Sequence, residues 1–105
     1  MEDDVALKQI LQRLVAEFKP TSVYLFGSRA TENFRPDSDY DLLLVVSASD
    51  RGRMARIDQA RQALRGVDAS VDVFVYTQIE FDEWKDEFSS IPETALNTGK
   101  ALRVG

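Results

Sequence analysis

An apolar run, Leu42 to Val46, follows directly on a stretch in which acidic residues alternate with other residues. This pattern predicts a strand over residues 39–47 with a charged entrance. Residues two apart in a strand share a face, so Asp39 and Asp41 are expected to project side by side. Two carboxylates about 4 Å apart repel by roughly 4 kcal/mol at an effective dielectric constant of 20. The pair therefore predicts a bound divalent cation, and Mg²⁺ prefers oxygen ligands of this kind.

The rest of the chain alternates between helical and strand patterns, with Gly and Pro as isolated breaks. No repeat, linker or low-complexity segment divides the 105 residues, so we expect a single domain over 1–105. Expected caps are Asp3 or Asp4, Ser49 or Asp50, Thr77 with Glu80 as a capping-box partner, and Ser90. The sequence predicts an α/β (α+β) sheet domain, with helices over 4–18, 28–33, 50–66, 77–88 and 90–97 and strands over 22–26, 39–47, 71–77 and 101–104.

A third carboxylate, Asp72, interrupts the apolar strand that runs from Val71 to Thr77. An Asp between Val71 and Val73 is a poor strand former and is costly to bury without a partner. If this strand neighbours the 39–47 strand, Asp72 converges with Asp39 and Asp41. Three carboxylates suit two Mg²⁺ ions that bridge a triphosphate and an attacking hydroxyl. Asp68 is a weaker candidate for the third position, because it lies nearer the turn after Gly66.

A candidate phosphate-binding segment is formed by Gly27, Ser28 and Arg29, where the 22–26 strand ends and a helix is expected to begin. Glycine lets a ligand approach the backbone closely. A helix N-terminus presents free N–H groups to phosphate, and the Ser28 hydroxyl and Arg29 guanidinium can add contacts.

Composition narrows the possible chemistry. The chain has no cysteine and no histidine, which excludes disulfides, thiolate metal sites and a Ser-His-Asp triad. Its net charge is −5, so we expect no direct nucleic-acid binding, and acidity suits divalent cations or a basic protein partner. The acidic N-terminus and the short apolar runs predict no signal peptide or membrane span, and hence a cytoplasmic location.

Each feature also has a simpler interpretation. Gly-Ser after a strand is most often only a turn, paired Asp residues are often caps, and Asp72 alone could be an edge or bulge residue. The Asp-x-Asp-x-Asp spacing does not fit an EF-hand, because Leu42 stands where that loop needs glycine and Ala48 where it needs glutamate. No Gly-Lys-Ser/Thr is present for a P-loop.

In combination, Gly27-Ser28, ten residues, Asp39-Tyr40-Asp41 and a later strand Asp resemble the signature of the DNA polymerase β-like nucleotidyltransferase superfamily. The fuller motif Gly-Ser-Arg-Ala…Asp-Ser-Asp-Tyr-Asp-Leu is similar to the minimal nucleotidyltransferases of prokaryotes. This resemblance implies the polymerase β-like fold, a small mixed sheet flanked by helices. It implies that Gly27 and Ser28 hold the triphosphate of ATP, that Asp39, Asp41 and Asp72 hold Mg²⁺, two ions in the family, and that Arg29 contacts phosphate.

The same resemblance implies a partner. Minimal nucleotidyltransferases lack the second domain that holds an acceptor in larger relatives, so we expect a homodimer or a partner protein. Such proteins are commonly paired with a helical HEPN toxin, and MntA-type antitoxins transfer AMP to a tyrosine of that toxin. The expected activity is thus AMP transfer by the antitoxin of a toxin–antitoxin pair. Two alternatives stay open: a binding module that neutralises its HEPN partner by contact, and a nucleotidyltransferase acting on a small molecule.

Overall fold

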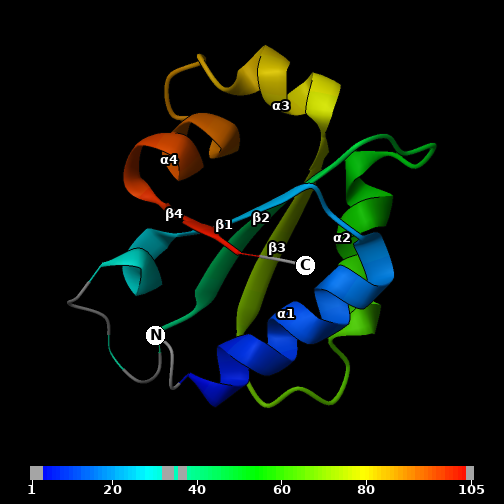
Figure 1. The fold of residues 1–105 in the computed structure, drawn as a ribbon, viewed down its shortest axis with the longest axis vertical. Helices are drawn as coiled ribbons and strands as arrows, with labels where there is room; N and C mark the ends of the chain where they lie inside the picture. Colours follow the sequence, from blue (N-terminus) through cyan, green and yellow to red (C-terminus); the bar gives the residue numbers. More distant parts are fainter. Residues whose placement is uncertain (1–3, 32–34, 36–37, 104–105) are drawn as a thin grey trace.

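The computed structural model describes residues 4–31, 35 and 38–103, which form one sheet with helices on both sides (Figure 1). Four helices, one 3₁₀ helix and four strands follow one another in these residues. In chain order they are α1 (Val5–Phe18), β1 (Ser22–Phe26), η1 (Gly27–Ala30), β2 (Tyr40–Val46), α2 (Arg53–Ala63), β3 (Val71–Thr77), α3 (Gln78–Trp84), α4 (Ile91–Thr98) and β4 (Lys100–Leu102).

The sheet has the strand order β3-β2-β1-β4 and is mixed. β2 pairs antiparallel with β1 and parallel with β3, and the parallel pair is joined by the crossover through α2. β4 pairs antiparallel with the outer side of β1. Leu42 to Val46 are buried on both faces of the sheet, which explains why this apolar run forms an inner strand. The α/β class predicted from the sequence, with a mixed sheet flanked by helices, is confirmed.

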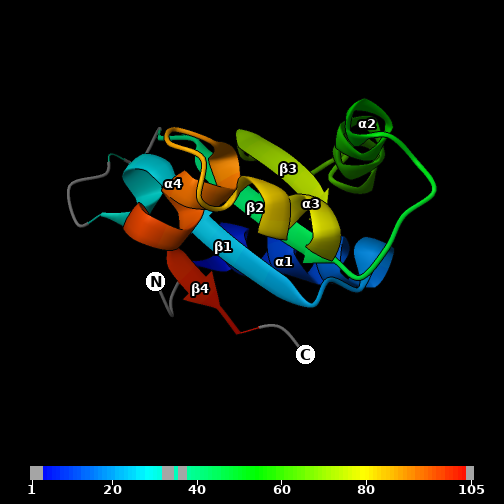
Figure 2. The same ribbon diagram turned by 90° about the horizontal axis from the view of Figure 1, so that it is seen from above.

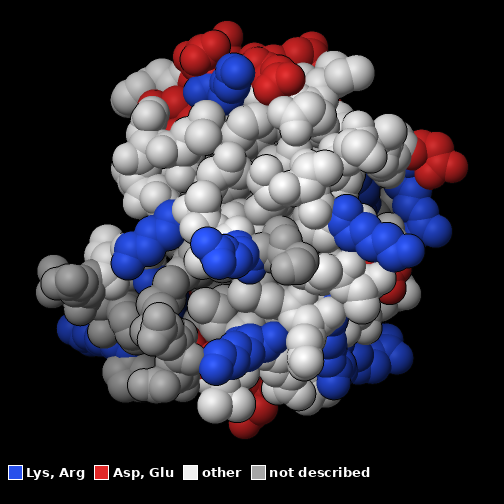
Figure 3. Space-filling model, in the orientation of Figure 1, with Lys and Arg blue, Asp and Glu red and all other residues white. Residues whose placement is uncertain are grey.

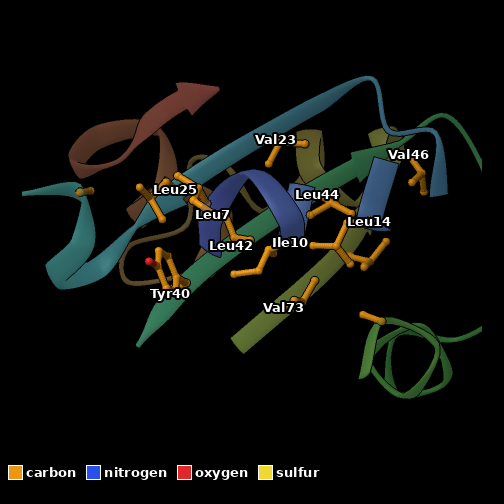
Figure 4. Packing of buried hydrophobic residues seen from close by; sticks show 13 residues of the cluster. Leu7, Ile10, Leu14, Val23, Leu25, Tyr40, Leu42, Leu44, Val46 and Val73 are labelled. Atoms are coloured by element: carbon orange, nitrogen blue, oxygen red, sulfur yellow. The ribbon is translucent and has the colours of Figure 1, made fainter. Parts of the chain in front are cut away.

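Two apolar clusters hold the helices to the two faces of the sheet (Figure 2). On one face, Leu7, Ile10 and Leu14 of α1 point at alternate residues of β2, such as Leu42 and Leu44 (Figure 4). On the other face, α3 and α4 pack on the intervening residues of the strands. The residues of this second cluster are Phe26, Leu43, Val45, Tyr76, Phe81 and Ala95.

Three of the predicted helix starts are confirmed by side-chain caps. Asp4 accepts a hydrogen bond from Leu7 N, and Ser90 accepts one from Glu93 N. Thr77 and Glu80 form the expected capping box at the start of α3. In each case a side-chain oxygen satisfies an N–H group that the first helical turn leaves without an intrahelical partner.

Several predicted boundaries were wrong. The helix expected over 50–66 covers only Arg53–Ala63, and its N-cap is Gly52, without a side-chain cap, because Ser49 Oγ instead accepts from Arg51 N in a turn. The helix expected to reach Phe88 ends at Trp84, whose carbonyl accepts from Ser90 Oγ.

Smaller shifts occur at three other elements. The 39–47 strand begins at Tyr40, the helix expected from Ser28 to Asn33 is the 3₁₀ turn η1, and the last strand is Lys100–Leu102. Glu32, Asn33 and Val104, which fell in the predicted segments, lie outside the described residues, as does Asp3. No helix within the described ranges has the length and apolar character needed to cross a membrane.

Candidate active site

The predicted site residues lie in a row across three adjacent strands. Phe26 pairs with Asp41, and Asp41 pairs with Asp72 on the other side, so Gly27 directly follows one end of the row. Adjacent strands are about 4.8 Å apart. Asp41 and Asp72 share the sheet face of Leu43 and Tyr76, because side chains alternate along a strand. Asp41 thus stands between a glycine turn on one side and a second carboxylate on the other.

Electrostatics single out Asp41 in this row. Its carboxyl is partly buried, and burial is the main cause that raises its pKa above the ordinary value of 3.8. The negative charges of Asp72 and then Asp39 raise the pKa further, and so does a hydrogen bond shared with Asp72. The three predicted carboxylates therefore interact across the strand entrance, although Asp39 precedes β2 and is exposed, as is Asp72.

This donor set fits a divalent cation in its chemistry. Carboxylate oxygens are hard ligands, and a cation would offset both the burial, which is the main cause of the raised pKa of Asp41, and the repulsion by Asp72 and Asp39, which adds to it. Among the described residues, no three acidic side chains are already grouped closely enough to form a complete cation site. Asp41 and Asp72 are the facing pair, and Asp39 acts on them from the entrance of the strand.

Gly27 is required at its position for two reasons. Its φ angle is +72°, a left-handed conformation that residues with a Cβ rarely adopt. A Cβ atom built on Gly27 would also collide with the Asp41 Oδ2 atom. The turn after β1 therefore lies so near the Asp41 carboxylate that no side chain fits between them. Ser28 follows it at the exposed surface, in the single 3₁₀ turn of η1.

Arg29 does not extend into solvent beside Ser28. Its side chain is 9% exposed, and its Nε donates a hydrogen bond of 3.0 Å to the carbonyl of Ser38, the residue before Asp39. The guanidinium lies 4.2 Å from the centre of the Tyr40 ring and 3.9 Å from an Asp4 oxygen. These contacts hold the backbone on both sides of Asp39, whereas the expected contact with phosphate stays a prediction.

Two residues of this network were not recognised as site residues from the sequence. The Tyr40 hydroxyl donates to the Asp4 carboxylate, at 2.9 Å and 2.8 Å from its two oxygens. Burial first, and then Asp4, raise the pKa of Tyr40. Asp4 was predicted only as a helix cap, and no local pattern connects it with a residue 36 positions later. The network ties the start of α1 to the entrance of β2.

Asp68, the weaker candidate for the third carboxylate, lies outside the row. It is exposed in the connection between α2 and β3, whereas Asp72 lies within β3 and opposite Asp41. The register thus brings Asp72, and not Asp68, beside the Asp41 carboxylate.

Comparison with known proteins agrees with this arrangement. A family model described as a nucleotidyltransferase domain matches residues 7–101, a range that contains the whole row from Gly27 to Asp72. The chain belongs to the nucleotidyltransferase domain family. Members of this family are transferases that generally use a nucleotide substrate and a divalent metal.

The nucleotidyltransferase domain is also similar to a solved structure. This is a crystal structure at 1.40 Å resolution from Sulfolobus solfataricus, described as that of a candidate nucleotidyltransferase. The two chains are 29% identical over 74% of this chain and 69% of the other, with a TM-score of 0.57. No curated protein matches the chain. The structural match supports the fold and the family.

Proposed function

We propose that this nucleotidyltransferase domain transfers AMP from ATP to a hydroxyl group, with Mg²⁺ as the metal. The observation that carries the proposal is the pairing of Asp41 with Asp72 in a row that ends at Gly27. A triphosphate beside Gly27 and Ser28 places its α-phosphorus toward Asp41, in the middle of the row. Asp41, with Asp72 beside it on β3 and Asp39 at the entrance of β2, supplies carboxylates that could hold the metal ions used in in-line phosphoryl transfer.

In this proposal the new bond forms between the acceptor oxygen and the α-phosphorus, and the bond from that phosphorus to pyrophosphate breaks. Asp39, Asp41 and Asp72 would hold Mg²⁺, two ions in this proposal, which supplies charge stabilisation for the attacking and leaving oxygens when bound. The chain contains no histidine, so the proton of the acceptor hydroxyl goes to Asp72 or to water. Asp72 is the outer carboxylate of the row and is exposed, which suits contact with an incoming acceptor.

We further propose that the acceptor is a tyrosine of a HEPN-type toxin and that this domain acts as the antitoxin. The distribution of charge supports a basic protein partner. Residues 78–89 contain five acidic residues and one lysine, a net charge of −4, against −5 for the whole chain. Figure 3 shows this acidic surface at the α3 end of the molecule, with Lys and Arg side chains spread over the rest of the visible face. Such a surface attracts a basic partner and raises the rate of association.

The test is to co-express the domain with a HEPN-type protein and to measure the intact mass of that protein. We expect a mass increase of one AMP with the wild-type domain and none with Asp39→Ala/Asp41→Ala. Asp68→Ala serves as the matched control, because it removes an exposed carboxylate outside the row, and it should leave the modification intact. A partner that is neutralised without any added mass would contradict AMP transfer and would favour inhibition by contact. Transfer to a small molecule alone would instead assign the activity to small-molecule modification.

A further inference from the structure

A groove along the outer edge of β3 leads to Asp72, at the end of the row opposite Gly27. β3 is the outer strand next to β2, so Asp72 is the outermost of the two facing carboxylates, and Gly27 lies toward β1. A nucleotide held at Gly27 therefore occupies the β1 side. A group that approaches Asp72 comes from the β3 edge.

Two cavities meet along this edge, between α2 and β3. One, of about 300 Å³, is lined by Arg61 of α2 and includes Asp72. The other, of about 270 Å³, is lined by Met54 and Arg53 near the start of α2. Ile57 and Phe74 line both cavities, so the two are adjacent and together form a groove along this edge, with Asp72 in the first cavity.

The backbone of β3 along this groove suits an added strand. The Ser70 carbonyl points at β2, where it accepts a hydrogen bond from Tyr40 N. Alternate residues of β3 point their backbone N–H and C=O groups toward and away from β2, so those of Val71, Val73 and Val75 point away from the sheet. The Val75 carbonyl already accepts a hydrogen bond of 3.0 Å from Arg56 Nη1. The outward groups of Val71 and Val73, on either side of Asp72, border the cavity that contains Asp72. An edge strand is a template for an extended segment of another chain.

The side chains along the groove define the chemistry of that segment. Ile57 and Met54 offer apolar surface, and Met54 is 73% exposed. Arg53 and Arg61 of α2 each line one of the two cavities and supply two positive charges. Arg53 lies over the Tyr76 ring, 5.1 Å from its centre, and Asp58 lies 3.7 Å from Arg61 in an exposed pair, which contributes little. A segment with alternating apolar and acidic residues matches this pattern, because strand side chains alternate between the groove and the flanking charges.

We infer that the β3 edge groove binds an extended segment of a protein acceptor, apolar and acidic in alternation, and presents a hydroxyl side chain of that segment to Asp72. The inference rests on the proposed transfer to a hydroxyl and adds where the acceptor binds. It separates the two substrates of the site: the nucleotide at the β1 side and the protein segment at the β3 side.

The test is a binding experiment without nucleotide. The ¹⁵N-labelled protein is titrated with a synthetic peptide that alternates Val and Glu around one Tyr, and amide shifts are followed by NMR. We expect the largest shifts at Val71 and Val73, and a loss of affinity of about fivefold in Arg61→Glu. The matched control is Arg65→Glu, which makes the same charge change just beyond α2, at a residue that lines neither cavity. A peptide with Lys in place of Glu should regain affinity for Arg61→Glu.

Three results would overturn the proposed peptide site: no amide shifts at millimolar peptide, shifts that map to α3 and α4, or equal losses of peptide affinity in the Arg61 and Arg65 variants. Binding of a single-stranded RNA oligonucleotide at these amides in preference to the peptide would also overturn it, since it would assign the groove to nucleic acid. Because the titration contains no ATP, its failure leaves AMP transfer standing. Conversely, a peptide that binds as expected in a protein that transfers no AMP to any acceptor contradicts the proposed function alone.

Discussion

At the scale of single residues, Asp41 combines the central position of the candidate site with an unfavourable environment. It is partly buried in a sheet, it faces Asp72, and its pKa is raised by burial and by two like charges. A free carboxylate in this position destabilises the folded protein when it is ionised. Groups of this kind are found at active sites because catalysis needs them there.

The first prediction follows for Asp41→Asn. Since the pKa of Asp41 is higher in the folded than in the unfolded protein, the folded state binds the proton more tightly. Stability is therefore lost as the pH rises from about 3.8 through the raised pKa, and the loss persists at neutral pH. In EDTA at pH 7, we expect Asp41→Asn to melt about 2–5 °C higher than the wild type, and AMP transfer to fall by roughly a hundredfold or more.

Thermal unfolding at pH 7 and pH 3 measures this effect. The advantage of the variant should shrink at pH 3, where both states of the wild type are protonated. Asp68→Asn is the control and should change neither the melting temperature nor the transfer rate. A variant that melts lower than the wild type at pH 7 would mean that Asp41 is stabilised by its surroundings, contrary to the raised pKa.

Arg29 gives a second prediction, because a positioning role and a phosphate-binding role for this residue predict different kinetic effects of its replacement. As a positioning residue it holds Ser38 and Tyr40 around Asp39; as a phosphate ligand it would bind ATP. Arg29→Lys keeps the charge but loses the planar donor that reaches Ser38 O and stacks on Tyr40. We expect kcat to fall about tenfold and the Mg²⁺ concentration needed for activity to rise, while KM for ATP at saturating Mg²⁺ stays the same.

Steady-state kinetics with ATP and Mg²⁺ varied separately distinguish the two roles. Tyr40→Phe is the companion variant: it keeps the ring under the guanidinium, loses the hydroxyl that bonds to Asp4 and interacts with Arg29, and should have a smaller effect. A rise in KM for ATP with unchanged kcat would assign Arg29 to phosphate binding, as the sequence motif predicted.

At the scale of elements, Arg56 ties α2 to β3 and α3. Its guanidinium is buried and donates to the carbonyls of Arg51 and Val75 and to the Glu80 carboxylate, at 2.6 Å for the shortest bond. Glu80 also accepts from Thr77 N in the capping box. The hydrogen bond from Arg56 is the main cause that lowers the pKa of Glu80 below its ordinary value of 4.5.

The third prediction concerns Glu80→Gln. Because the pKa is lowered in the folded protein, the stability contributed by the ionised carboxylate is present above about pH 4.5 and is lost as the pH falls through the lowered value. We expect the variant to be less stable by about 2 kcal/mol at pH 7, because a buried guanidinium loses its counter-charge.

Urea unfolding at pH 7 and at pH 3 checks this prediction. The difference from the wild type should become smaller at pH 3. The neighbouring Glu83→Gln, at an exposed position of the same helix, should be within about 0.5 kcal/mol of the wild type at both values. Equal effects of the two substitutions would show that the Arg56 contact contributes nothing specific.

The helices and strands were largely predictable from local patterns, and their ends less so. Asp4, Thr77 and Ser90 are caps because a short polar side chain precedes a helical pattern, which the sequence displays directly. The start of α2 was misplaced because Ser49, a good cap by type, is used in a turn before the helix begins. Such competition between two local hydrogen bonds is decided by the surrounding structure.

At the scale of the whole molecule, the sequence predicted three candidate carboxylates and only conditionally that they meet. That Asp41 faces Asp72 depends on the parallel pairing of β2 with β3, a long-range feature that no local pattern specifies. The same holds for the network from Asp4 to Tyr40, and for the burial of Arg29. The groove at the β3 edge arises from how α2 lies against the sheet, so it could be found only in three dimensions.

The close approach of Gly27 to Asp41 has a consequence for the way these proteins diverge. Any side chain at position 27 would both strain the backbone and collide with the Asp41 carboxylate, so the two positions cannot drift independently. A lineage that replaces the glycine is therefore expected to lose the aspartate beforehand or together with it. In a newly sequenced genome, a relative that carries a bulky residue at this turn is therefore expected to lack the aspartate of the central strand while keeping the fold.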